Sequence, residues 1–468
     1  MKPRAGWTFA IVSIALFMVV LDNLVVTNAL PSIRQDLGAT IQQLEWTVNA
    51  YTLTYAVLLL TGAALGDRFG RRRMFAAGLG IFTLASAAAA VAPSTSALIA
   101  ARALQGLGAA IVTPLTLTLL SEAVPEGRRG LAIGAWSGIS GLGVALGPVV
   151  GGAIVTGISW HWIFWLNVPI GLITLPLALT RLTESHGESR ALDLRGLGLA
   201  SVGLLGVVYG VVHASSAGWT AATVIGPLAI GAVLIAAFLA WELRAAEPML
   251  PMSFFRNRAF AATNGVSLAM YFGTFGSVFL LAQFFQVAQH YSALQAGLRI
   301  LPWTMMPMLI APIAGLLSDR IGGRPLMTAG LALQGGGLAW LAAVTTPTVA
   351  YADLVPGFVM AGAGMALVFA PAANTVLGAV RPKQAGQASG ATNAIRELGG
   401  VLGVSVLATV FSAHGGFSSP QAYVDGLIPA VWVGAAVLFA GAFVALLVPK
   451  KRRERAAAPR SAEARATA

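Results

Sequence analysis

Two stretches of sequence decide the fold of this chain: Leu65-Gly66-Asp67-Arg68-Phe69-Gly70-Arg71-Arg72-Arg73 and Leu317-Ser318-Asp319-Arg320-Ile321-Gly322-Gly323-Arg324-Pro325. Both follow the pattern L-x-D-R-x-G-x-R, and each lies between two long apolar segments. The pattern places an acid, two arginines and a turn glycine at the same point of two separate regions. The repeat therefore predicts that the chain consists of two related halves.

The composition is that of a membrane protein. The chain has 468 residues, of which 57% are hydrophobic and 10% charged, whereas soluble domains are roughly a quarter charged. Its apolar runs are about 20 residues long and unbroken, which predicts membrane-spanning α-helices rather than the alternating strands of a barrel. The absence of cysteine excludes disulfides and thiolate metal sites, and the five histidines show no ligand spacing, so we expect no metal.

The apolar runs predict fourteen spans in an all-α polytopic protein. Their expected ranges are 9–29, 46–65, 74–92, 97–120, 131–156, 162–180, 197–213, 222–241, 260–285, 294–317, 326–345, 353–376, 391–412 and 428–448.

The distribution of positive charge predicts the orientation. With both termini in the cytoplasm, 25 of the 29 lysines and arginines fall on that side, as loops that stay cytoplasmic require. The net charge of +12 therefore indicates a multi-pass protein of the cell membrane and not a nucleic-acid-binding protein. We expect the basic tail, residues 450–468, to contact anionic lipid headgroups.

The repeated loops follow the second and the tenth span, so each half is predicted to hold six helices. This gives two six-helix bundles around an inserted hairpin, and repeated halves around a midplane cavity are a recurring plan of secondary transporters. The predicted units are bundle 1–196, transmembrane hairpin 197–241, cytoplasmic linker 242–259, bundle 260–449 and a basic tail 450–468.

Five stretches, in this order and in these spans, make the chain resemble the major facilitator superfamily, and within it the fourteen-span drug–proton antiporters. They are 21–31 (LDNLVVTNALP), the loop at 65–73, 102–106 (RALQG), 147–152 (GPVVGG), and 162–164 (WIF) leading to 167–171 (NVPIG). Two positions depart from the family pattern. Thr27 stands where the family usually has Asn, with Asn28 one place later, and Ala63 stands where it usually has Gly.

Asp22 is the sharpest candidate for chemistry. It lies about 13 residues into the first span, roughly 20 Å from the cytoplasmic edge, where a carboxylate is costly and must face a cavity or a partner. A carboxyl that binds either a proton or a cationic substrate can couple the two. The alternative is an acid that holds the first span against a neighbouring helix.

Arg102 begins a polar stripe in the fourth span, with Gln105 and Thr113 at helical spacing. The resemblance implies that this arginine serves proton coupling. The alternative is a buried arginine that satisfies carbonyls at a helix end.

Arg396 and Glu397 lie in the thirteenth span. Adjacent residues point about 100° apart on a helix, so they need not pair. The family more often has Gln at the position of Glu397, which is here an extra titratable group. It is either a second proton site or an acid paired with a loop base such as Lys383.

Glycines in the fifth span predict close helix packing, because small residues let helices approach in a membrane, and Pro148 permits a kink. The resemblance associates this motif with antiporters. Its residues are Gly143, Gly147, Pro148, Gly151 and Gly152. The repeated loops are expected to act as conformational latches, the first the stronger, through Asp67, Arg68, Gly70, Arg71, Asp319, Arg320 and Arg324.

A substrate pocket is expected, by resemblance, between spans 1, 4, 9 and 12, with aromatic and methionine side chains for lipophilic ligands. Core packing is the alternative for each residue. The candidates are Asn28, Gln105, Thr113, Asn264, Tyr271, Phe275, Gln283, Met365, Asn374 and Asn393.

The sequence contains no catalytic motif and no phosphate-binding loop, so we expect a transporter rather than an enzyme. The predicted function is proton-coupled export of lipophilic drugs or antibiotics by alternating access. A proton gradient supplies the energy, without a cofactor, and the protein works as a monomer. Two rivals remain: a symporter on the same fold, and a membrane scaffold or sensor that transports nothing.

Overall fold

The computed structural model describes residues 3–186, 193–246, 248, 250–380 and 385–450. Over these residues the chain is helical. The helices of the first bundle and the hairpin are α1 (Pro3–Leu37), α2 (Ile41–Phe69), α3 (Arg71–Ala90), α4 (Thr95–Ala123), α5 (Glu126–Gly157), α6 (Trp162–Trp165), α7 (Asn167–Arg181), α8 (Leu194–Ala217) and α9 (Ala222–Glu242). After a short 3₁₀ helix η1 (Met252–Arg256) come α10 (Arg258–Val287), α11 (Ala293–Thr304), α12 (Met306–Ile321), α13 (Gly323–Val344), α14 (Tyr351–Gly378), α15 (Ala385–His414) and α16 (Pro420–Ala445).

Each predicted span coincides with one helix or with two consecutive helices, although the edges differ by several residues. Among the described residues, 12 helices are long and apolar enough to cross a membrane, or up to 13 when the bent pair Ile41–Leu59 and Thr61–Phe69 counts as one span. The all-helical membrane fold is thus confirmed. The number of fourteen crossings stays a prediction.

Two predicted spans are each divided into two consecutive helices near a proline, although each still counts as one candidate crossing. The sixth breaks between α6 and α7, where Pro169 lacks the N–H that would bond to the carbonyl of Trp165. The tenth breaks between α11 and α12, where Pro307 leaves the carbonyl of Trp303 without its helical donor. Apolar character alone did not predict either break.

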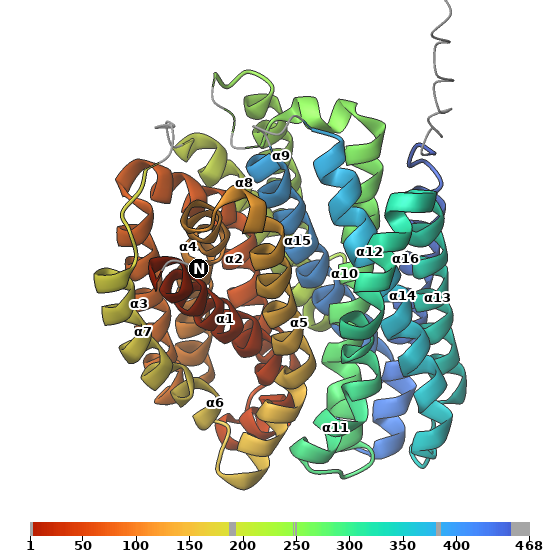
Figure 1. Ribbon diagram of the computed structural model, residues 1–468. Helices are drawn as coiled ribbons and strands as arrows, with labels where there is room; N and C mark the ends of the chain where they lie inside the picture. The colour runs from red at the N-terminus through yellow and green to blue at the C-terminus, as the bar shows by residue number, and fades with distance from the viewer. Residues whose placement is uncertain (1–2, 187–192, 247, 249, 381–384, 451–468) are drawn as a thin grey trace, which may run out of the picture.

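The two halves repeat the same helix pairings (Figure 1). In the first half α1 packs on α5, α2 on α4, α3 on α4, and α3 on α7. In the second half the corresponding spans pair as α10 on α15, α12 on α14, α13 on α14, and α13 on α16. The red-to-yellow helices α1–α7 and the green-to-blue helices α10–α16 of Figure 1 are these two bundles.

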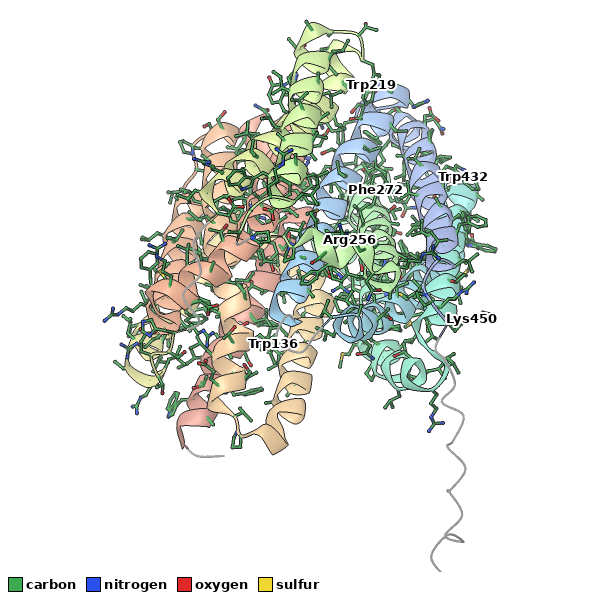
Figure 2. All side chains as sticks on the ribbon, turned by 90° about the horizontal axis from the view of Figure 1, so that it is seen from above. Trp136, Trp219, Arg256, Phe272, Trp432 and Lys450 are labelled. Atoms are coloured by element: carbon green, nitrogen blue, oxygen red, sulfur yellow. The ribbon has the colours of Figure 1, made fainter. Side chains whose placement is uncertain are left out.

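Helices α8 and α9 pack on each other as a hairpin, and α8 also contacts α2 of the first bundle and α15 of the second. Figure 2 shows the hairpin against the boundary of the two bundles, with Trp219 in its loop at the outer edge. The inserted segment therefore touches both halves.

The turn glycine of each repeated loop has a positive φ. Gly70 has φ 102° and Gly322 has φ 85°, a region that side-chain-bearing residues rarely adopt. Each ends one helix and begins the next, α2 to α3 and α12 to α13. The pattern that opened the sequence thus corresponds to one turn geometry, used twice.

Candidate functional site

Asp22 and Arg102 form a buried ion pair between α1 and α4. Arg102 donates from Nη1 to Asp22 Oδ2 at 2.5 Å, and both side chains have no exposed surface. Asp22 was expected to face a cavity or a partner, and in the structure it faces a partner, Arg102. A pair sealed to this degree is rare, because taking both charges out of water is costly unless other bonds compensate.

Three neutral side chains complete the cluster. Gln105 donates to Asp22 Oδ1 at 3.1 Å and accepts from Arg102 at 2.9 Å. Asn167, the first residue of α7, donates to the same Oδ1 at 2.7 Å. Ser86 of α3 lies behind them and accepts from Gln105 at 2.7 Å. The cluster therefore ties together α1, α3, α4 and α7.

Arg102 is also held on its other sides. Its Nε donates to the carbonyl of Thr47 on α2 at 3.2 Å, and its guanidinium lies 4.3 Å from the ring centre of Tyr51 and 5.8 Å from that of Phe164. Its Nη2 has no hydrogen-bond partner. The arginine thus binds Asp22 across the bundle instead of satisfying carbonyls at the end of its own helix.

The sequence predicts Asp22 and Arg102 as proton-coupling residues and Gln105 as a substrate contact. Asn167 enters the sequence pattern only as part of a motif, and the pattern does not include Ser86. The signal for Asn167 was present, since an amide in an apolar segment needs a buried partner.

The second half has its own buried cation, Arg396 on α15. Its guanidinium lies 4.8 Å from the ring centre of Phe369 and 6.0 Å from that of Tyr271, while Nη1 donates to Asn393 at 3.4 Å. Tyr271 stacks on Phe275 with ring centres 5.3 Å apart. These residues form a cation–aromatic cluster on α10, α14 and α15.

Glu397 does not pair with Arg396 among the described side chains, an outcome that the helical spacing left open. Its Oε2 is buried and has no hydrogen-bond partner. Lys383, the loop base considered as its partner, lies outside the described residues. A role for Glu397 as a second proton site stays a prediction.

The two bundles are joined by contacts at one end, which we name the closed end. It contains the loops at 38–40, 158–161, 288–292 and 415–419. Gln286 Nε2 donates to the carbonyl of Asn28 at 3.1 Å, and the N–H of Leu294 donates to Thr156 Oγ1 at 3.0 Å. The guanidinium of Arg34 lies 4.1 Å from the ring centre of Phe417.

The glycine–proline motif of α5 lies at this contact. Asn28 donates from Nδ2 to the carbonyl of Pro148 at 2.5 Å. A Cβ on Gly152 would lie 2.6 Å from Leu294 Cα, and one on Gly151 would lie 2.9 Å from Val25 Cα. Gly143 and Gly147 pack on side chains of α1. The motif therefore lets α5 approach both α1 of its own half and α11 of the other.

The first repeated loop is an ion-pair network within the first bundle. Arg71 donates from Nε to Asp67 at 2.8 Å and also pairs with Glu122 at the end of α4. Glu184, after α7, accepts from the N–H of Arg72 at 2.9 Å. Arg68 lies over the ring of Phe69 instead, at 5.4 Å.

The second copy is less engaged in the part of the chain that the structure describes. Arg320 and Arg324 pair with no described carboxylate, and the side chain of Asp319 lies outside that part. Unequal strength of the two latches, expected from sequence, stays a prediction.

The substrate candidates do not converge on one place. Tyr271, Phe275 and Asn393 belong to the Arg396 cluster, and Asn28 lies at the closed end. Asn264 and Gln283 are buried and donate to carbonyls of their own helix, Phe260 and Phe279. Asn374 donates to Ser318 at 3.0 Å. Met365 is buried, and Thr113 has a buried hydroxyl without a partner.

A sequence model of the Major Facilitator Superfamily matches residues 12–404. The chain belongs to the Major Facilitator Superfamily. Multidrug resistance protein Stp of Mycobacterium tuberculosis (strain CDC 1551 / Oshkosh) is 36% identical over 408 residues, 87% of this chain and 76% of Stp. The tetracenomycin C resistance and export protein of Streptomyces glaucescens is 32% identical, over 92% of this chain and 80% of its own.

The solved structures agree on the fold. A crystal structure of a POT family transporter in complex with a thioalcohol conjugated peptide matches with a TM-score of 0.71, over 95% of each chain, at 13% identity. This superfamily member is therefore a multi-pass transporter of the cell membrane, not an enzyme. Membership in the superfamily, inferred from five stretches of sequence, is confirmed.

Proposed function

We propose that this superfamily member is a proton-coupled antiporter that exports lipophilic drugs or antibiotics by alternating access. Export is supported by relatives whose names describe multidrug resistance and tetracenomycin C resistance and export. Proton coupling is carried by one observation, the fully buried pair of Asp22 and Arg102. A scaffold or sensor has no need of charge in the middle of a membrane.

Protonation of Asp22 changes the balance of this cluster. The proton removes the charge that compensates Arg102, and breaking a buried pair in this way costs about 3–5 kcal/mol. The helices α1, α4 and α7, which carry Asp22, Arg102 and Asn167, must then adjust. Because α1 also packs on α10 of the second bundle, an adjustment of α1 acts on the contact between the halves.

The closed end gives the direction of the cycle. If the termini lie in the cytoplasm, the closed end faces outward, and the structure corresponds to a state that takes up substrate from inside. Asp22 is paired with Arg102 in this state. Antiport follows when a proton favours one state and substrate the other, and the two ligands need not touch.

The Arg396 cluster is the candidate for substrate contact. Stacked Tyr271 and Phe275 offer flat apolar surface, which suits lipophilic ligands of varied shape. A buried cation there disfavours a strongly cationic ligand at close range, so neutral or monocationic compounds are the expected substrates. The proton gradient provides the energy, about 2.3 kcal/mol for each charge that moves through 100 mV.

The test is proton release from purified protein in weak buffer when lipophilic compounds such as ethidium are added. Wild-type protein should release protons with a panel of these compounds, and Asp22→Asn should not. Asp36→Asn is the matched control, because Asp36 is a half-exposed acid on the same helix. Equal release from Asp22→Asn and wild type would remove Asp22 from the coupling mechanism.

A further inference from the structure

Glu45 is a buried acid that the proposed cycle does not yet use. It lies in the second turn of α2, its residue is 0% exposed, and neither carboxylate oxygen has a hydrogen-bond partner among the described residues. Asp22, by contrast, has three partners. An ionised carboxylate without any partner is among the most costly groups to bury.

The neighbours of Glu45 on its helix show which way it faces. Gln42, Glu45 and Asn49 are spaced three and four residues apart, so they share one face of α2. Gln42 donates from Nε2 to the carbonyl of Val212 on α8 at 3.4 Å, and Asn49 donates from Nδ2 to Ser405 on α15 at 2.8 Å. Glu45 therefore lies at the junction of the first bundle, the second bundle and the hairpin.

The hairpin covers this junction. Adjacent carbonyls of α8 accept one donor from each bundle, Val212 from Gln42 and Val211 from Thr409 at 3.1 Å. Towards the opposite end, an apolar cluster fills the same junction with Leu53, Val57, Val208, Val212 and Val401. These polar groups of the junction are thus bonded to one another, and none of them donates to Glu45.

No charged group compensates Glu45 among the described side chains of the helices that pack on α2. On α1 and α4, Arg102 pairs with Asp22. Arg34 lies over the ring of Phe417, and Asp36 accepts a hydrogen bond from Trp160. On α8 and α15, His213 and His414 bond to carbonyls of their own helices, Arg396 lies over Phe369, and Glu397 lies two turns from Ser405. The charges of α3 are Arg71, Arg72 and Arg73, at the opposite end.

We propose that Glu45 is a second proton-binding site, and that this carboxyl must be protonated for the closed end to close. When the junction opens, water reaches Glu45 and a hydronium ion can give it a proton and leave as water. Closure then buries a neutral acid instead of an unpaired charge. The inference rests on the proposed function only for the alternation between two states, and it assigns to Glu45 a proton distinct from that of Asp22.

The chain contains no cysteine, so a pair of engineered cysteines can report on the closed end without background labelling. Ser96 at the start of α4 and Thr348 in the loop before α14 are exposed, one on each bundle. Both lie at the closed end, since α3 and α13 run to it from the repeated loops and Gln289 of the closed end donates to the carbonyl of Val349. Spin labels at Ser96→Cys and Thr348→Cys would measure the distance across this end in nanodiscs between about pH 5 and pH 8. No substrate is needed.

In the Asp22→Asn background, which removes the opposing contribution of the Asp22 proton, the closed fraction should rise as pH falls. One bound proton changes an equilibrium by up to about tenfold per pH unit. Glu45→Gln should therefore reduce the pH dependence of the ratio of closed to open protein by up to that factor, and its closed end should stay closed at high pH. Asp353→Asn, a neutralised exposed acid at the same end, should behave as wild type. Glu45→Ala, also neutral, makes the same prediction if Glu45→Gln does not assemble.

An unchanged pH dependence in Glu45→Gln would overturn the proposal, as would a neutral variant that prefers the open distance. Asp22→Asn separates this result from the proposed function. That variant should lose substrate-induced proton release and keep the pH dependence of closure that Glu45 provides. If wild-type protein releases no proton with any compound, the label distances still test the role of Glu45, because they are measured without substrate.

Discussion

Asn167 donates a 2.7 Å hydrogen bond to Asp22 across 145 residues of sequence. Asn167 starts α7 directly after the break at Leu166, so the interruption of the sixth span places this amide in the charged cluster. Asp22 Oδ1 accepts hydrogen bonds from Asn167 and Gln105, while Oδ2 accepts one from Arg102. Two neutral donors thus share with Arg102 the task of stabilising the carboxylate.

Asn167→Ala should therefore weaken proton coupling without removing either charge. A hydrogen bond to a charged group contributes about 1.5–3 kcal/mol, so Asp22 should bind its proton about tenfold or more tightly. The measurement is the pH dependence of substrate-induced proton release, which should shift to higher pH. Leu172→Ala on the same helix, an exposed side chain, serves as control, and a matching shift there would contradict the assignment.

Asp22 and Arg102 should depend on each other for stability. Asp22→Asn leaves Arg102 buried without a counter-ion, which should lower the free energy of unfolding by about 3–5 kcal/mol. The double variant Asp22→Asn with Arg102→Gln removes both charges and should recover much of that loss. Thermal unfolding in detergent measures both, and additive losses would show that the two side chains do not interact.

Much of the fold could be predicted from the sequence, because apolar length and the repeated loop are local signals. The site was predicted only in part. Asp22 and Arg102 stand out as charges in apolar spans, whereas Ser86 and Asn167 acquire their roles through contacts between helices far apart in sequence. Glu45 illustrates the same limit: beside the polar start of its helix it looks like a solvated acid, and only the packing of α8 and α15 shows that it is buried.

The first repeated loop should control the rate of conformational exchange. Arg71 bridges Asp67 and Glu122 and so ties α3 to the ends of α2 and α4. We expect Arg71→Ala to slow turnover several-fold while the apparent substrate affinity stays within about twofold, since a loss confined to exchange leaves binding intact. Arg73→Ala is the matched control, because its side chain is 71% exposed. Unchanged turnover in Arg71→Ala would exclude a latch.

The closed end should be sensitive to added bulk at Gly152. A Cβ there would meet the backbone of α11, 2.6 Å from Leu294 Cα, whereas a Cβ on Gly143 would meet only side-chain atoms of α1, the nearest 3.1 Å from Val20. A flexible side chain can move aside, but a helix backbone must shift as a unit. Gly152→Ala should therefore open the closed end, seen as a longer distance between labels at Ser96→Cys and Thr348→Cys, and reduce transport about tenfold or more, as a shift of about 1.4 kcal/mol would. Gly143→Ala should keep the wild-type distance. The same opening in both variants would mean that the contact between α5 and α11 does not hold this end together.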